Sequence, residues 1–314
     1  MPKQNVVYLK GPVIKVGINE HEDGSKEAVC VVGVIRGFRN IGDGRNEIKI
    51  DRPIVMSRNA DMISQIETLN KNDIVSVKGV VATRTVMKGS TCPFCNTKNE
   101  QEGLAVYIEP VFIEKECTMD SDSSSLNYLN SIREISNQVY LFGNLTRDPK
   151  KVKVRNGPTV TQYPLAVHRK YVIKEDSPSV DVDFPWIKVY GQNAISDRER
   201  LQKGSTVFID GLLQTRAINK KSVCINCNKR YEWKDRALEV VPFETEYISG
   251  YFSDEEVAKN AEEQKMQILK SKGLDKFFIN NSANSYSDYD EDYDNDDITE
   301  EDIQAGIDTL EDEE

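Results

Sequence analysis

The sequence predicts an all-β protein of two small barrels in tandem with short helices, followed by a longer helix and a disordered acidic tail. Three observations carry this prediction. The chain repeats itself at a constant offset of 132 residues, each repeat reads as short alternating strands with Gly and Asn turns, and acidic residues gather at the end. With 314 residues, of which 30% are charged, the chain suits two modest cores better than one large core.

The repeat is visible within the sequence itself. Residues 5–11 (NVVYLKG) align with residues 137–143 (NQVYLFG). The same shift pairs Lys71 with Lys203, Val75 with Val207, Gly79 with Gly211, Thr83 with Thr215, Arg84 with Arg216, Cys92 with Cys224, Cys95 with Cys227 and Pro110 with Pro242. Chance does not place both cysteine pairs and the glycines in one register, so we infer an internal duplication.

Within each repeat, apolar and polar residues alternate over short runs such as 75–81 and 206–213. Strands of this spacing, in repeats of about 110 residues, favour a small closed or partly open barrel. We therefore divide the chain into a first repeat at 1–118, a linker with a short helix at 119–135, a second repeat at 136–250, a helical extension at 251–280 and an acidic tail at 281–314.

The linker between the repeats contains a predicted helix. A Ser/Asp segment at 120–125 is followed by Leu126, Leu129, Ile132 and Ile135 at helical spacing. We expect this short helix to pack beneath the second barrel.

The end of the chain differs from the rest in composition. A capping box of Ser253 and Glu256 predicts a helix that stops near Gly273. Residues 281–314 hold 15 acids and no Lys or Arg, so residues 1–280 carry about +4 of a total charge of −11. A basic body with a disordered acidic tail fits a polyanionic partner. The apolar residues expected to bind protein partners are Ile298, Ile303, Ile307 and Leu310.

Four phrases of the second repeat resemble the bacterial and phage single-stranded DNA-binding protein family. They are NQVYLFGNLTRDP at 137–149, YPLAVHR at 163–169, DFPWIKVYG at 183–191 and KGSTVFIDGLLQTR at 203–216. The resemblance implies an OB-fold barrel in each repeat, coating of single-stranded DNA in replication, recombination and repair, and recruitment of other proteins by the tail. The first repeat inherits this interpretation through the duplication, although its residues 47–56 contain no aromatic side chain.

The residues themselves favour the same binding role. In a strand over 184–190 (FPWIKVY), alternation places the aromatic residues on one face and Ile187 and Val189 in the core. Bases stack on such rings whatever their identity, while cations follow the phosphates. The predicted nucleic-acid contacts are Phe184, Trp186, Lys188, Tyr190, Arg147, Lys151, Lys153, Arg155, Arg169, Lys170 and Arg216. The alternative is that the aromatic residues pack against the other repeat or a partner.

Each repeat also carries one C-x-x-C pair, at 92–95 and at 224–227. A structural zinc takes four ligands, so two pairs brought together by the repeats would complete one shared site. The predicted zinc ligands are Cys92, Cys95, Cys224 and Cys227. Two alternatives remain open, namely a site shared between subunits and no metal at all, including a redox pair. A thioredoxin-like role is disfavoured because no βαβ pattern surrounds either pair.

Other function classes find less support in the sequence. The chain contains two histidines, His21 and His168, and no Walker loop, H-E-x-x-H or G-x-S-x-G motif, so we expect no enzyme. An interaction scaffold of a replication complex and a single-stranded RNA binder remain as alternatives. Without an apolar run of membrane-spanning length or a signal peptide at the start, we expect a protein of the bacterial cytoplasm, or of the host cytoplasm if a phage encodes it.

Overall fold

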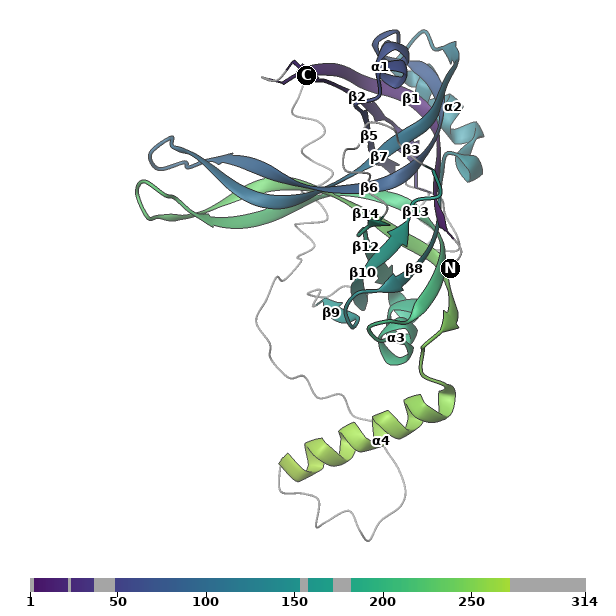
Figure 1. The fold of residues 1–314 in the computed structure, drawn as a ribbon, viewed down its shortest axis with the longest axis vertical. Coiled ribbons are helices and arrows are strands. Elements are labelled where there is room, and N and C mark those ends of the chain that lie inside the picture. The colour runs from purple at the N-terminus through teal and green to yellow at the C-terminus, as the bar shows by residue number, and fades with distance from the viewer. Residues whose placement is uncertain (1–2, 22–23, 37–48, 153–157, 172–181, 272–314) are drawn as a thin grey trace.

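The structure is a computed structural model that describes residues 3–21, 24–36, 49–152, 158–171 and 182–271 (Figure 1). Strands dominate these residues, which confirms the predicted all-β class. Two closed barrels lie next to each other, and two long hairpins project from them.

The first barrel contains five strands. They are β1 (Gln4–Glu20), β2 (Lys26–Val32), β5 (Ile54–Ser57), β6 (Asp73–Thr91) and β7 (Lys98–Thr118). All neighbours pair antiparallel except β5 and β7, which run parallel where Val55 meets Ile108, and the β1–β6 pairing closes the ring. The helix α1 (Ala60–Glu67) joins β5 to β6, and a separate pair, β3 (Val34–Ile35) and β4 (Ile50–Asp51), lies outside the ring.

The second barrel has the same connectivity. Its strands are β8 (Asn137–Leu145), β10 (Val160–His168), β12 (Trp186–Tyr190), β13 (Thr206–Val223) and β14 (Arg230–Ser249). The parallel contact is again made by the third and fifth strands, where Ile187 meets Val240. Short strands β9 (Lys150–Val152) and β11 (Val182–Asp183) pair with β10, and α3 (Gly191–Arg200) joins β12 to β13. Two five-stranded barrels of this kind agree with the predicted OB-fold class.

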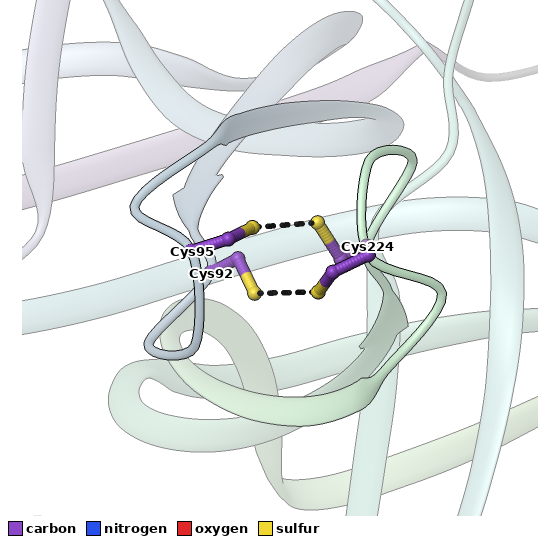
Figure 2. Close-up of side chains that lie close together, drawn as sticks. Cys92, Cys95 and Cys224 are labelled. Atoms are coloured by element: carbon purple, nitrogen blue, oxygen red, sulfur yellow. Dashed lines mark hydrogen bonds between the residues drawn. The ribbon is translucent and has the colours of Figure 1, made fainter.

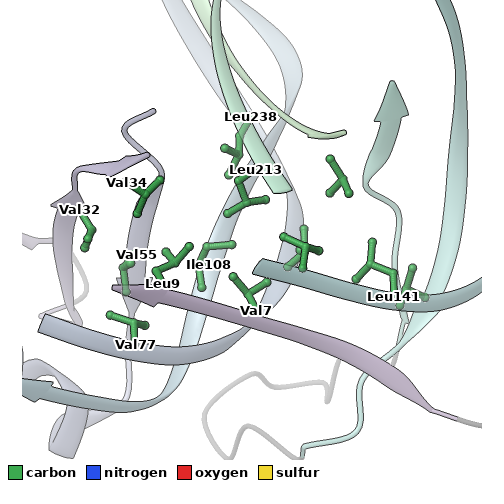
Figure 3. Packing of buried hydrophobic residues seen from close by; sticks show 14 of the residues in the cluster. Val7, Leu9, Val32, Val34, Val55, Val77, Ile108, Leu141, Leu213 and Leu238 are labelled. Carbon is green, nitrogen blue, oxygen red and sulfur yellow. The ribbon is translucent and has the colours of Figure 1, made fainter. Parts of the chain in front are cut away.

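The barrels are joined through their first strands, which pair antiparallel with Val7 opposite Val139. These two residues are 132 positions apart, so a local twofold relation between the repeats passes through this pair. Alternate residues of both strands point inward, and the buried core extends through both barrels (Figure 3). The shared sheet therefore fixes one barrel against the other.

The helices near the barrels correct one expectation. The linker forms α2 (Asp122–Ser131) and the short helix η1 (Arg133–Ile135), but α2 packs against β1 and β3 rather than beneath the second barrel. Leu129 is buried there because Gly11 has no side chain to exclude it. The helix α4 (Asp254–Ser271) begins as predicted, with Ser253 and Glu256 exchanging capping hydrogen bonds.

The hairpins β6–β7 and β13–β14 extend well beyond the barrels and lie side by side (Figure 1). Each hairpin turns at its C-x-x-C pair, and both inner ends belong to the barrel cores. Two distant cysteine pairs are thereby carried to one place.

Candidate nucleic-acid interface and metal centre

The strand β12 presents the predicted aromatic face. Ile187 and Val189 are buried in the barrel core, while Trp186 and Tyr190 are half-buried on the opposite face. Alternation along this strand therefore follows the sequence-based expectation. Phe184 departs from it, because β11 ends at Asp183 and the Phe184-Pro185 step interrupts the strand. Phe184 is nonetheless 46% exposed.

The structure corrects the expected exposure of Lys188. Its side chain shares the face of Trp186 and Tyr190 but is only 2% exposed. The ammonium lies 3.4 Å from Oε1 of Glu239, and Arg216 donates to the same oxygen at 3.0 Å. Burial lowers the pKa of Lys188, and the carboxylate of Glu239 opposes that effect. Lys188 and Arg216 thus neutralise a buried acid instead of reaching solvent.

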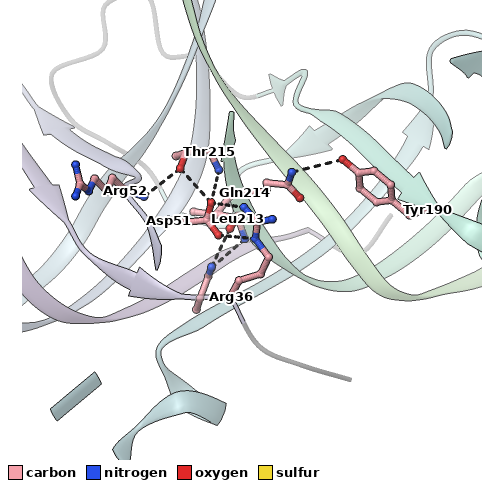
Figure 4. Close-up of polar contacts among 8 residues, drawn as sticks. Arg36, Asp51, Arg52, Tyr190, Leu213, Gln214 and Thr215 are labelled. Carbon is pink, nitrogen blue, oxygen red and sulfur yellow. Dashed lines mark hydrogen bonds and ion pairs between the residues drawn. The ribbon is translucent and has the colours of Figure 1, made fainter. Parts of the chain in front are cut away.

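The same polar layer supports Tyr190. Burial, followed by the nearby charge of Glu239, raises the pKa of Tyr190 to about 12. The side-chain amide of Gln214 donates to its hydroxyl at 3.5 Å (Figure 4). Tyr190 therefore stays neutral and in place, with a compensated ion layer beneath the aromatic face.

A second correction concerns Arg169. Its guanidinium donates to both carboxylate oxygens of Asp183, at 2.6 and 2.9 Å, and the pair is almost completely buried. Asp183 also accepts from the backbone N–H of Thr83 at 2.8 Å, and Thr83 belongs to the other repeat. This arrangement anchors β11 against the first hairpin and leaves Arg169 no reach towards a phosphate.

The reciprocal contact involves Asp51 (Figure 4). Asp51 accepts from Arg36 and, at 2.7 Å, from the backbone N–H of Thr215 in the second repeat. Asp51 and Asp183 are 132 residues apart, as are Thr83 and Thr215. Sequence reasoning recorded the two threonines but missed the two aspartates, whose equal offset was the available signal.

The remaining predicted cations differ in their positions. Arg147, Lys151 and Lys170 are exposed, whereas Lys153 and Arg155 lie outside the described residues, as do Ile298, Ile303, Ile307 and Leu310. Sequence reasoning missed Lys150, which is also exposed. The sheet register places Lys150 opposite Gln162, and Gln162 opposite Lys188. Because residues paired across antiparallel strands point to the same side, Lys150 shares the aromatic face.

The first repeat carries a different side-chain set at the corresponding place. Ile54 and Met56 stand where the second repeat has Trp186 and Lys188. Met56 packs with Tyr107, and the Arg84 guanidinium lies 5.5 Å from the centroid of the Tyr107 ring. An aromatic ring is therefore present, but it is buried and comes from β7.

The four knuckle cysteines meet at the tips of the two hairpins (Figure 2). The sulfur atoms of Cys92 and Cys227 are 3.7 Å apart, those of Cys95 and Cys224 are 3.5 Å apart, and all four lie within 4.8 Å of one another. Tetrahedral zinc with bonds of about 2.3 Å separates its sulfur ligands by about 3.8 Å. The expected grouping within one chain is confirmed, and the donor set fits zinc.

The turns that hold the cysteines are equivalent in the two repeats. Asn96 and Asn228 have positive φ angles of 56° and 55°, which asparagine tolerates better than most residues. The N–H of Asn96 donates to the carbonyl of Cys92 at 2.9 Å, and that of Asn228 to Cys224 at 3.0 Å. Each turn therefore folds its two thiols towards the same side.

The electrostatics of the cluster also favour a cation. Hydrogen bonds from the hydroxyl and the N–H of Thr97 lower the pKa of Cys95 to about 6. Although the backbone N–H of Lys229 lowers the pKa of Cys227, burial and the sulfur of Cys95 raise that pKa to about 11. Four thiols this close cannot all ionise beside one another unless a positive ion joins them.

Contacts between the hairpins continue below the cysteines. The Asn99 side chain accepts from the N–H of Ile225 at 2.9 Å, and the hydroxyls of Ser90 and Tyr231 are 2.7 Å apart. Lys88 forms an ion pair with Asp235 at 2.7 Å. These contacts align the two hairpins before any ion binds.

Comparison with known proteins agrees with this site. Residues 136–234, which include the aromatic strand and the second cysteine pair, match the model of the Single-strand binding protein family. Through this segment the chain belongs to the single-strand binding protein family. The resemblance predicted from the second repeat is confirmed.

Single-strand binding proteins of several bacteria match the chain. The "Single-stranded DNA-binding protein" of Helicobacter hepaticus is 31% identical over 86 residues, covering 27% of this chain and 51% of its own length. "Single-stranded DNA-binding protein 2" of Staphylococcus aureus is 34% identical over 85 residues, covering 27% and 60%. The chain thus spans about half to three fifths of the length of these single-strand binding relatives.

The crystal structure of the wild-type single-stranded DNA binding protein from Thermus aquaticus aligns with 81% of this chain and 97% of its own. Its TM-score is 0.49 and its sequence identity is 18%. Among the described residues, no helix is both long and apolar enough to cross a membrane.

Proposed function

We propose that this chain binds single-stranded DNA without catalysing a reaction. The observation that carries the proposal is the half-exposed aromatic face of β12, which lies inside the segment that matches the single-strand binding family. Trp186, Tyr190 and the exposed ring of Phe184 stack on bases. Stacking needs no particular base, so the protein coats DNA regardless of sequence and serves replication, recombination and repair.

The phosphate contacts follow from the corrected cation set. Lys150 lies on the aromatic face, and Arg147, Lys151 and Lys170 are exposed nearby in the chain. These side chains are available to follow the DNA backbone, which makes binding weaken as salt rises. Lys188, Arg169 and Arg216 act instead from beneath, by holding the aromatic face and β11 in position.

We further propose that the four cysteines bind one zinc ion per chain. Support comes from the sulfur spacing, the paired turns and the chemistry of an all-thiolate donor set. Bound zinc would supply a structural cross-link between the hairpins, with all its ligand positions filled by Cys92, Cys95, Cys224 and Cys227.

Exchanging Trp186 for Ala tests the binding face. The variant should remain folded and lose about 1–3 kcal/mol of DNA-binding free energy, since one stacking partner disappears. Titration with poly-dT, followed by fluorescence anisotropy, measures the loss. In the parent protein, addition of poly-dT should quench Trp fluorescence.

Two controls accompany this variant. Phe112→Ala removes a ring that is 48% exposed on another face and should leave DNA affinity unchanged. Val189→Ala should leave the binding surface intact but cost about 2 kcal/mol of unfolding free energy through a core cavity. If Trp186→Ala binds poly-dT like the parent, the face assignment is wrong. Absence of any salt-dependent binding by the parent would favour the interaction scaffold, and preference for poly-U would favour RNA.

We also propose that the acidic tail regulates binding and recruits protein partners. Residues 281–314 lie outside the described residues, and the support is their composition of 15 acids and no Lys or Arg. A tethered polyanion competes with DNA at high effective concentration. Deleting 281–314 should therefore tighten poly-dT binding at low salt and abolish capture of replication proteins. Equal affinity of both forms at low salt would contradict the competition.

A further inference from the structure

The two projecting hairpins carry the positive charge of the protein. We call residues 82–107 and 214–238 the hairpin blade. The blade holds ten Lys or Arg and four Asp or Glu, a net charge of +6, whereas residues 1–280 together carry about +4. The barrels and helices outside the blade are therefore slightly negative. A polyanion is attracted to the blade more strongly than to any other part of the body.

Much of this charge is available at the outer end. Asp235 is already shared by Lys88 and Lys220, and Lys221 lies 3.7 Å from Glu232. Other cations have no carboxylate within ion-pair distance among the described residues. These are Lys98, Lys229, Arg230, Lys234 and Arg236, all of them exposed.

The extreme tip is apolar as well as basic. Phe94 is 57% exposed and Ile225 is 77% exposed, each from the middle of a C-x-x-C pair. The ammonium of Lys229 lies 4.9 Å from the centroid of the Phe94 ring. Since the sulfur cluster lies directly behind them, these two side chains are held outward instead of collapsing into a core.

Shape separates the tip from the aromatic face of β12. A single strand is bound in grooves where bases lie against a sheet and cations line the walls. The tip is the projecting end of two hairpins, so it offers no groove to a flexible strand (Figure 1). A duplex end offers what the tip complements, because its last base pair is a flat apolar surface bordered by phosphates. Apolar side chains flanked by cations are used by other proteins as wedges against base steps.

We propose that the blade tip docks on the duplex end where a double-stranded segment meets single-stranded DNA. Phe94 and Ile225 contact the terminal base pair, and Lys98, Lys229 and Arg230 contact the phosphates on either side. This inference rests on the proposed function, since β12 holds the adjoining single strand. The protein then recognises junctions as well as covering the strand between them.

The test compares three labelled DNAs, namely a single strand, a blunt duplex and a duplex with a single-stranded overhang. The full chain is titrated against each at the same salt concentration. The parent should bind the overhang DNA at least about fivefold more tightly than the single strand. The double variant Phe94→Ala/Ile225→Ala should lose this preference and keep its affinity for the single strand. Phe112→Ala, which removes an equally exposed ring from the body, should change neither value.

Two further measurements make the result decisive. Zinc content and thermal unfolding of the double variant should match the parent, because neither residue is a ligand or a core residue. Trp186→Ala should weaken binding to the single strand and to the overhang DNA alike, which separates failure of the proposed function from failure of this inference.

Three outcomes would overturn the inference. The parent may bind overhang DNA and single strand equally, in which case the tip reads no junction. The double variant losing single-strand affinity to the same extent would make the tip part of the single-strand path. Unchanged DNA binding together with loss of a captured replication protein would make the tip a protein docking site.

Discussion

Cys92→Ser and Cys224→Ser should each remove the bound zinc completely, although the two residues come from different repeats. The parent should contain about one zinc per chain, measured by elemental analysis after purification under reducing conditions. Because three thiolates remain in either variant, the loss reports that all four belong to one centre. Structural zinc of this kind contributes apparent binding free energies of about 10–16 kcal/mol, so the melting temperature should fall strongly.

The chain provides a matched control for this experiment. Cys117 is an exposed thiol outside the cluster, and Cys117→Ser should retain both zinc and stability. A chelator added to the parent should reproduce the effect of Cys92→Ser on the hairpins, with protease cleavage near residues 92–97 and 224–229 as the readout. Two zinc ions per chain, or none in the reduced parent, would contradict a shared centre.

Asp183→Ala should cost about 3–5 kcal/mol of unfolding free energy, as measured by urea denaturation. The substitution leaves Arg169, whose side chain is 3% exposed, as a buried charge without its carboxylate. It also removes the acceptor for the N–H of Thr83, so one link between the repeats is lost. The double variant Asp183→Ala/Arg169→Met should recover much of the stability, because no buried charge then remains unpaired.

The reciprocal contact supplies the comparison. Asp51→Ala should be clearly less costly than Asp183→Ala, since the guanidinium of Arg36 is 25% exposed and water can solvate it. Equal losses for the two variants would show that the lost backbone acceptors dominate and that the buried charge does not. The exposed Asp61 serves as a neutral control for removal of a carboxylate.

The features that sequence reasoning predicted correctly are those with a local or periodic cause. The constant offset of 132 residues predicted the paired cysteines, and alternation along β12 placed Ile187 and Val189 inside. The capping box predicted the start of α4 from a pattern spanning four residues. Each of these depends on neighbours in the chain or on a repeated register, so no tertiary contact was needed to find it.

The sequence also narrowed the metal centre without choosing between its alternatives. Two C-x-x-C pairs are compatible with one ion shared within a chain or with ions shared between subunits. The choice depends on where two hairpins point, and that follows from the pairing of β1 with β8. Only the tertiary structure brings Cys92 within 3.7 Å of Cys227.

The tertiary structure alone decided which charged residues reach solvent. Lys188 follows the strand alternation of the aromatic face, yet it is buried because Glu239, 51 residues later, lies against it. Arg169 is taken out of the candidate interface in the same way by Asp183. The sequence determined the repeat, the strand faces and the ligand set, since these rest on spacing. Partners of buried charges are distant in sequence, and no spacing rule identifies them before the strands are paired.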